Sequence, residues 1–191
     1  MDKDLFNNKQ DRGIVLNTPI LFLIYNRPGT AQEVFNSIRK VRPKKLYVAS
    51  DGPRPGNADD VILCKKSRDI LEQIDWDCEL HTRFLEENLG GCDPAVRSEI
   101  SWFFENEEMG IILEDDIVPN ADFFYFCEKL LMRYENNPSV MMISGYNPVS
   151  SMQELDSKDY YCSRWASIWG WATWKDRWEK LDTEFADSKD F

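Results

Sequence analysis

The sequence predicts an α/β domain built on a mostly parallel central sheet with helices on both faces. Apolar runs of strand length alternate along the chain with stretches of helical spacing, which is the order that parallel sheets require. The runs are also nearly continuous in apolar residues, as in strands that are covered on both faces. With 191 residues, the chain is long enough for one domain and short for two. We therefore expect a flexible N-terminal segment over 1–17 and a single domain over 18–191.

The first half of the chain contains two strand–helix units. Residues 19–25 form a continuous apolar run, and apolar residues three and four apart follow over 29–41. Residues 45–50 are the second strand, which ends in a turn rich in glycine and proline before a helix over 58–74. Residues 78–84 alternate in polarity and predict a third, weaker strand.

The second half continues the alternation and adds an aromatic segment. A loop with the pair Gly90 and Gly91 precedes a helix, for which Asp93 is the expected N-cap and Pro94 the first residue. The further expected elements are this helix to residue 106, a strand over 109–113, a helix over 123–134, a strand over 139–143 and a polar loop over 151–159. Residues 160–178 are rich in tryptophan. The acidic stretch 181–191 offers no partner for Phe185, which suggests a fold that is truncated at its C-terminal end.

The composition excludes several classes of protein. The formal net charge of -11 argues against a basic face for nucleic-acid phosphates, although a nucleotide can still bind through a metal. The five cysteines are widely spaced and contain no Cys-x-x-Cys pair, which indicates neither a disulfide framework nor a zinc site. No apolar run reaches the ~20 residues of a membrane span. We expect a cytoplasmic protein, with peripheral association at the inner membrane face left open.

An acidic triplet follows directly on the strand expected at 109–113. It consists of Glu114, Asp115 and Asp116. Carboxylates at the mouth of a buried strand repel one another and lose solvation, so a divalent cation is their natural partner. Acidic triplets elsewhere are usually solvated surface charge, and it is the position at the end of a strand that favours a site.

Two other strands also end in polar residues. Arg27 follows the first strand and Asp51 follows the second. In an open parallel sheet, ligands bind at the edge where the carboxyl ends of the strands meet, so these residues should lie beside the triplet. Oxygen ligands without a nearby Cys or His suit Mg2+ or Mn2+, and these ions also bind phosphate oxygens. The sequence thus predicts a metal-assisted nucleotide site. Arg27 and Asp51 are also ordinary residues of surface turns, which is the alternative interpretation.

The residues around the triplet resemble a known family. ILEDDIVPNADFF, at 112–124, is similar to the acidic metal-binding motif of GT-A nucleotide-sugar glycosyltransferases, especially the N-acetylglucosaminyltransferase I-like group. PILFLIYNRP and LYVASDG resemble the opening strands of that fold, and GWATW resembles an aromatic acceptor-side segment of related bacterial sugar transferases. The resemblance covers about residues 19–178. It implies a GT-A, Rossmann-like domain that binds a nucleotide-diphosphate sugar, with a UDP-sugar favoured.

The resemblance also implies roles for the three carboxylates. Asp116, the last of the triplet, would be the direct metal ligand. Asp115 and Glu114 would lie near the ribose and the metal-bound water, with Asp115 close enough to share the metal. The implied metal is Mn2+ or Mg2+.

For the nucleotide itself, the resemblance implies three further contacts. Arg27 would contact the nucleotide, and Asp51 would accept a hydrogen bond from the base ring. Arg97, on the helix after the glycine pair, would approach the diphosphate, a placement that rests on its position alone.

The implied reaction is transfer of the sugar to a glycan or lipid-linked acceptor, with inversion at the anomeric carbon. A carboxylate would act as general base on the acceptor hydroxyl. Asp176 and Asp182 are weak candidates for this base, which is otherwise to be sought beyond Phe191. Trp169 and Trp171 are candidates for stacking on the acceptor or donor sugar, with core packing as the main alternative.

Two alternatives remain open from the sequence. A sugar nucleotidyltransferase would share the sheet and the acidic site, but such an enzyme is expected to carry a glycine-rich basic loop after the first strand, which NRPGTAQ is not. A non-catalytic nucleotide-sugar-binding module would have kept the donor half of the site and lost the base.

Overall fold

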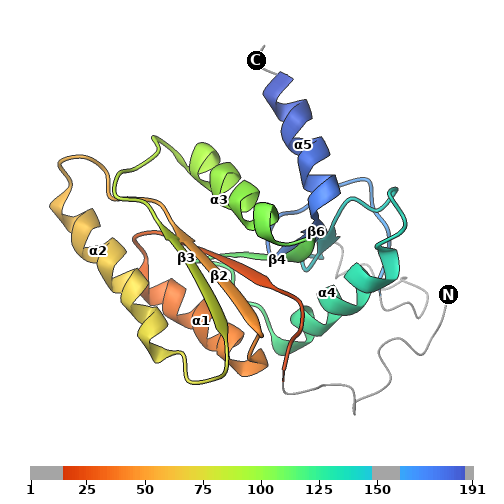
Figure 1. Ribbon diagram of the computed structural model, residues 1–191, viewed down its shortest axis with the longest axis horizontal. Helices are drawn as coiled ribbons and strands as arrows, with labels where there is room; N and C mark the ends of the chain where they lie inside the picture. Colours follow the sequence, from red (N-terminus) through yellow and green to blue (C-terminus); the bar gives the residue numbers. More distant parts are fainter. Residues whose placement is uncertain (1–14, 148–159, 188–191) are drawn as a thin grey trace.

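The fold is a layered α/β arrangement in which a six-stranded sheet lies between two sets of helices (Figure 1). This computed structural model describes residues 15–147 and 160–187, with side chains to residue 181. The elements are β1 (Ile20–Ile24), α1 (Pro28–Val41), β2 (Lys45–Ser50), α2 (Ala58–Asp69), the 3-10 turn η2 (Ile70–Gln73), β3 (Glu79–Phe84), α3 (Cys92–Asn106), β4 (Met109–Glu114), α4 (Ala121–Tyr134), β5 (Ile143–Ser144), β6 (Trp171–Trp174) and α5 (Lys175–Asp187).

The sheet has the strand order β3-β2-β1-β4-β6-β5. β1 pairs in parallel with both β2 and β4, and β2 pairs in parallel with β3. β6 is antiparallel to β4 and also to β5. The predicted α/β class with a mostly parallel sheet is therefore confirmed.

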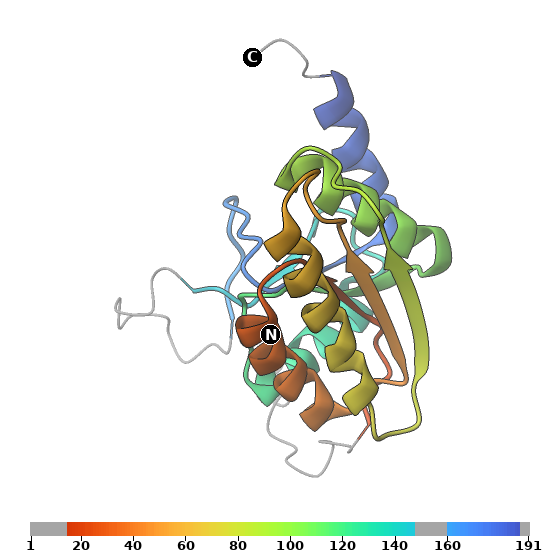
Figure 2. The ribbon, with the colours of Figure 1, turned by 90° about the vertical axis from the view of Figure 1, so that its left-hand side faces the viewer.

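Side chains of the central strand β1 alternate between two cores. Ile20 and Phe22 pack in the core beneath α1 and α4, whereas Leu21 and Leu23 pack in the core beneath α3. Figures 1 and 2 show α1, α2 and α4 on one face of the sheet and α3 and α5 on the other. All of β1 is buried, which explains why its apolar run has no polar alternation.

Most predicted boundaries differ from the structure by one or two residues, and two of the differences concern the start of α3 and the start of the domain. α3 begins at Cys92 with Gly91 in the N-cap position, so Asp93 lies in the first turn and is not the cap. The chain turns earlier than predicted because Gly90 adopts a φ of 88°, which favours glycine. The packed domain also begins before residue 18. Leu16 is fully buried, and its backbone bonds with Val41 and Lys44.

The part of the chain after α4 departs most from the prediction. The strand expected over 139–143 is wrong, because only Ile143 and Ser144 are in strand conformation, in β5. The edge of β4 is instead taken by β6, which returns antiparallel from the tryptophan-rich segment. α5 then follows without a break. The loop expected over 151–159 lies outside the described residues.

The helices of the described residues are all too short or too polar to cross a membrane.

Candidate functional site

The carboxyl ends of β1 and β4 bring Arg27 and the acidic triplet together. These two strands are neighbours, with Leu23 opposite Glu114. The backbone turns directly after β4, and the N–H of Ile117 donates to the carbonyl of Glu114. Arg27 Nη1 lies 2.6 Å from Asp116 Oδ2 and 3.5 Å from Asp115 Oδ1. One guanidinium is therefore shared between two adjacent carboxylates.

The three carboxylates of the triplet lie close together, and two of them share the guanidinium of Arg27. Asp115 is buried, and this burial raises the pKa of its carboxyl group, although the Tyr25 backbone N–H and Arg27 oppose the rise. Burial also raises the pKa of Glu114, and the two neighbouring aspartates add to that effect. Like charges that lie close together and are partly removed from solvent favour the binding of a cation.

The chemistry of the triplet fits a hard cation only in part. Carboxylate oxygens are the ligands that Mg2+ and Mn2+ prefer, and Asp116 is half-exposed and so accessible. In the described part of the chain, no three His, Cys, Asp or Glu side chains are arranged to hold a metal. Asp116 and Asp115 are the residues that would hold an ion, and water and phosphate oxygens would supply its other ligands, as is usual for Mg2+.

Asp51, at the end of β2, organises the loop after β3. Its Oδ1 accepts hydrogen bonds from the backbone N–H groups of Gly52 and Leu89, at 2.8 and 3.1 Å. Its Oδ2 accepts one from Asn88 Nδ2 at 2.7 Å. A Cβ at Gly52 would lie 2.4 Å from the backbone of Glu87, so the two loops touch. Three donors from the protein already occupy the carboxylate that was expected to contact the base.

A buried hub around Asp60 was missed by the sequence analysis. Its carboxylate accepts hydrogen bonds from Tyr25 Oη, Asn26 Nδ2 and the Arg54 guanidinium, at 2.6 to 2.9 Å. Arg54 first, and then Asn26 and Tyr25, hold the pKa of Asp60 well below its usual range. A local signal exists, because Asn57 caps α2 by accepting from the Asp60 N–H. The partners Tyr25 and Asn26, which directly follow β1, cannot be predicted from that signal.

Glu99 is a second buried acid that the sequence analysis missed. Burial raises the pKa of Glu99 to about 8, with Asp51 raising it further and Arg83 lowering it. Arg83 does not bond to this carboxyl group and donates instead to the carbonyl and hydroxyl of Ser98. Within the described residues, Glu99 Oε1 has no hydrogen-bond partner.

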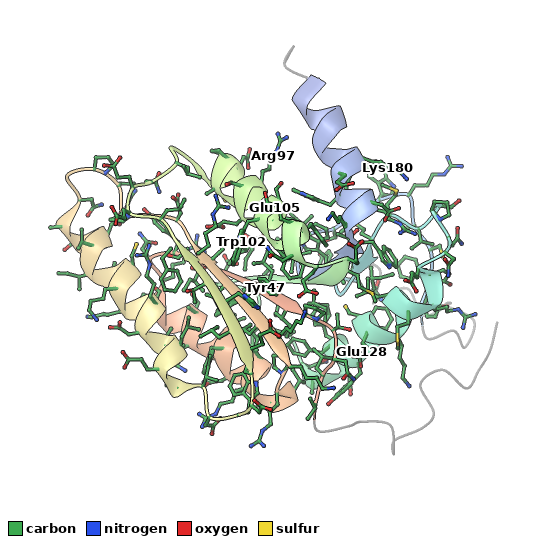
Figure 3. The ribbon with its side chains drawn as sticks, in the orientation of Figure 1. Tyr47, Arg97, Trp102, Glu105, Glu128 and Lys180 are labelled. Atoms are coloured by element: carbon green, nitrogen blue, oxygen red, sulfur yellow. The ribbon has the colours of Figure 1, made fainter. Side chains whose placement is uncertain are left out.

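Arg97, which was expected near a diphosphate, lies on the outer side of α3. Figure 3 shows its side chain directed away from the sheet. Glu105 and Trp102 lie further along the same helix (Figure 3). Although Arg97 follows the glycine pair in the chain, its side chain is therefore not directed toward the sheet.

The two candidate tryptophans have different environments. Trp171 is buried in β6, opposite Ile112 of β4, and its ring lies 6.3 Å from that of Trp178. Trp169 is 65% exposed and lies on the turn before β6. Because β6 runs antiparallel to β4, this turn is at the same edge of the sheet as the triplet. Of the two, only Trp169 has a face available to a ligand.

Asp176 lies at the opposite edge of the sheet. Trp174, the last residue of β6, pairs with Met109 at the start of β4. The Asp176 side chain forms an ion pair with Arg177 there, at 2.6 Å. Asp182 follows on α5, and its side chain lies outside the described residues. α5 thus begins a full strand length away from the triplet, and the structure does not bring Asp176 to it.

Comparison with known proteins gives no family for this chain. No protein-family model matches the sequence, and no curated protein is similar to it. We therefore infer the function from the geometry of the edge where β1, β2 and β4 end.

Proposed function

We propose that this chain is a GT-A-type glycosyltransferase that binds a nucleotide-diphosphate sugar, with a UDP-sugar favoured, through a divalent cation. The observation that carries the proposal is the acidic triplet at the end of β4, where one guanidinium, that of Arg27, is shared by Asp115 and Asp116. The pKa of Asp115 is raised by burial despite that guanidinium. A divalent cation would relieve this repulsion, and the diphosphate would balance the charge that the cation adds.

The residues of this edge have separable tasks in the proposed complex. Asp116 and Asp115 would hold Mn2+ or Mg2+, which when bound stabilises the charge of the departing diphosphate. Arg27 would then exchange the carboxylate of Asp116 for a phosphate oxygen. Asp51 and Asn88 hold the loop after β3 beside the same edge, where it would form one wall for the nucleoside.

The transfer step needs a base that deprotonates the acceptor hydroxyl as it attacks the anomeric carbon. Asp176 is poorly placed for this task, because it lies at the amino end of β4. We therefore assign the donor site to named residues and leave the base unassigned. The inverting outcome is an expectation from the family resemblance.

The proposal is tested by calorimetric titration of UDP, and of GDP for comparison, into the full chain with and without Mn2+. We expect Mn2+ to tighten UDP binding by at least about tenfold, or about 1.4 kcal/mol. Asp116→Asn should abolish this gain. Asp59→Asn is a matched control, because Asp59 is an exposed carboxylate at the start of α2. Equal UDP affinity with and without Mn2+, or an unchanged gain in Asp116→Asn, would contradict the proposal.

A second measurement separates an enzyme from a binding module. Release of UDP from UDP-sugars in the presence of Mn2+ is followed by phosphorus NMR, with and without added saccharides. Turnover that Asp116→Asn abolishes supports the transferase. A chain that binds UDP-sugar with Mn2+ and releases no UDP is a binding module.

A further inference from the structure

The turn before β6 presents an aromatic surface that the donor site does not use. Trp169 and Tyr146 are 65% and 45% exposed, and their ring centroids lie 5.3 Å apart with the planes tilted by 51°. Trp165, in the same segment, is 90% exposed. In contrast, Trp171 and Trp174 in β6 are buried. We call Tyr146 and Trp169 the aromatic pair.

The backbone holds the aromatic pair in a fixed place. Gly145 N–H donates to the Gly170 carbonyl at 2.8 Å, and Gly170 N–H donates to the Ile168 carbonyl at 3.0 Å. Gly170 has a φ of 72°, which favours glycine, and so the turn is tight. The pair is therefore presented by a turn that is hydrogen-bonded at both of its ends.

The aromatic pair lies beside the acidic triplet. A Cβ at Gly170 would be in van der Waals contact with Ile117 and Leu113, the residues on either side of the triplet. A Cβ at Gly145 would lie 2.6 Å from the Phe123 ring of α4, so the backbone there packs directly on that ring. The exposed rings and the carboxylates of Glu114, Asp115 and Asp116 thus share one edge of the molecule.

This combination of groups suits a saccharide. The apolar C–H face of a sugar ring stacks on an exposed aromatic ring, and its hydroxyl groups bond to nearby polar side chains. Ser144 and Asn147 lie near Tyr146 in the chain and carry such groups, and their side-chain oxygens also accept from the Tyr146 N–H and the Tyr161 hydroxyl. The triplet and the net charge of -11 disfavour an anionic sugar or an anionic lipid surface at this edge.

We propose that Tyr146 and Trp169 form a subsite for an uncharged saccharide, which is the acceptor of the proposed transfer. Saccharide binding follows from the aromatic pair itself. Its role as acceptor rests on the proposed function, because the subsite would place a sugar hydroxyl beside the donor held at Asp116.

The test is binding of the full chain to an array of immobilised neutral oligosaccharides of hexoses and N-acetylhexosamines, with uronate-containing oligosaccharides beside them. We expect retention on at least one neutral series and at least a tenfold loss in Trp169→Ala, with most of the binding kept in Trp169→Phe. Ile62→Ala, which removes an exposed apolar side chain on α2, should bind as the wild type does. Thermal unfolding of each variant confirms that the fold is intact.

Three outcomes would overturn the inference. They are retention on no neutral saccharide, retention that Trp169→Ala leaves unchanged, and retention on uronate-containing sugars alone. Sedimentation with phosphatidylglycerol vesicles that depends on Trp169, without saccharide binding, would assign the aromatic pair to a membrane and also overturn it. The UDP titration with Mn2+ keeps the two proposals apart. Saccharide binding without UDP binding refutes the donor site and the acceptor role but keeps the saccharide subsite, and UDP binding without saccharide binding refutes only the subsite.

Discussion

Asp60 and Asp116 lie at the same edge of the sheet, and each pairs with an arginine at 2.6 Å, yet their surroundings are opposite. The Asp60 side chain is 2% exposed and also accepts from Tyr25 and Asn26. The Asp116 side chain is 50% exposed and shares its arginine with Asp115. The distance of an ion pair thus says little about its role. The number of donors around the carboxylate separates a closed structural hub from an open site.

The same contrast is visible in the pKa values. Arg54 and the other donors hold the pKa of Asp60 well below its usual range, whereas burial raises that of Asp115. Folding is therefore favoured by the negative charge of Asp60 and opposed by the charges of Glu114 and Asp115. We expect the loss of a carboxylate to destabilise the fold at Asp60 and to change its stability little at Asp116.

The largest effect is expected for Asp60→Ala. The substitution leaves the Tyr25 hydroxyl, the Asn26 amide and the Arg54 guanidinium without their acceptor, and unsatisfied buried donors are costly. The urea midpoint should fall further than in the variants of Glu99, Asp116 and Lys65 described below. Asp59→Ala, at the neighbouring exposed position, is the control and should change the midpoint little. Equal midpoints for Asp60→Ala and Asp59→Ala would show that the hub does not hold these loops.

Glu99→Gln tests whether hydrogen-bond donors, or burial alone, cause the difference between a stabilising carboxylate such as Asp60 and a destabilising one. Glu99 is buried like Asp60, but Oε1 has no partner within the described residues. Its pKa is about 8 in the fold against an ordinary 4.5, so the wild type loses stability as pH rises between these values. Below about pH 4 the variant and the wild type should be similar. At pH 9 the variant should be more stable by on the order of 3 kcal/mol.

Urea unfolding at pH 4, 7 and 9 measures this difference. The matched control is Glu105→Gln, on the exposed side of the same helix, which should change the free energy of unfolding little. A Glu99→Gln effect that is constant from pH 4 to 9 would mean that Glu99 stays ionised in the fold.

Asp116→Asn should leave stability nearly unchanged. The substitution removes one of three mutually repelling charges and one half-exposed ion pair, and exposed pairs contribute about 1 kcal/mol or less. The free energy of unfolding should therefore stay within about 1 kcal/mol of the wild type. Measured beside the lost Mn2+ response of UDP binding, this outcome separates a binding role from a structural one. Destabilisation comparable to that of Asp60→Ala would remove the distinction.

The smallest effect is expected for Lys65→Gln. Lys65 and Asp69 form an exposed pair one turn apart on α2, with solvent as the alternative partner for both groups. The melting temperature should not change measurably. A clear fall in the melting temperature would show that this exposed ion pair stabilises the fold, although its carboxylate has few hydrogen-bond donors around it.

The sequence predicted those features that depend on local pattern. Continuous apolar runs identified the parallel strands, and the ends of β1 and β4 placed Arg27 beside the triplet. The Asp60 hub was not predictable in this way, because it depends on how α2 packs against β1. The positions of Trp169 and Asp176 relative to the triplet both depend on β6. This short segment forms a strand by pairing with the edge of β4. The local sequence periodicity does not predict such a strand.

The antiparallel return of β6 also has a consequence during synthesis. The triplet begins at the last residue of β4, and within the described residues the edge of β4 away from β1 pairs with residues 171–174, which are translated long after β4. At about 5–20 residues per second, this interval is roughly 3–12 s. Throughout it, the nascent chain presents an unpaired apolar strand edge, which is the kind of surface that joins other chains. We expect expression yield to depend on temperature and chaperone supply more than the stability of the finished fold suggests.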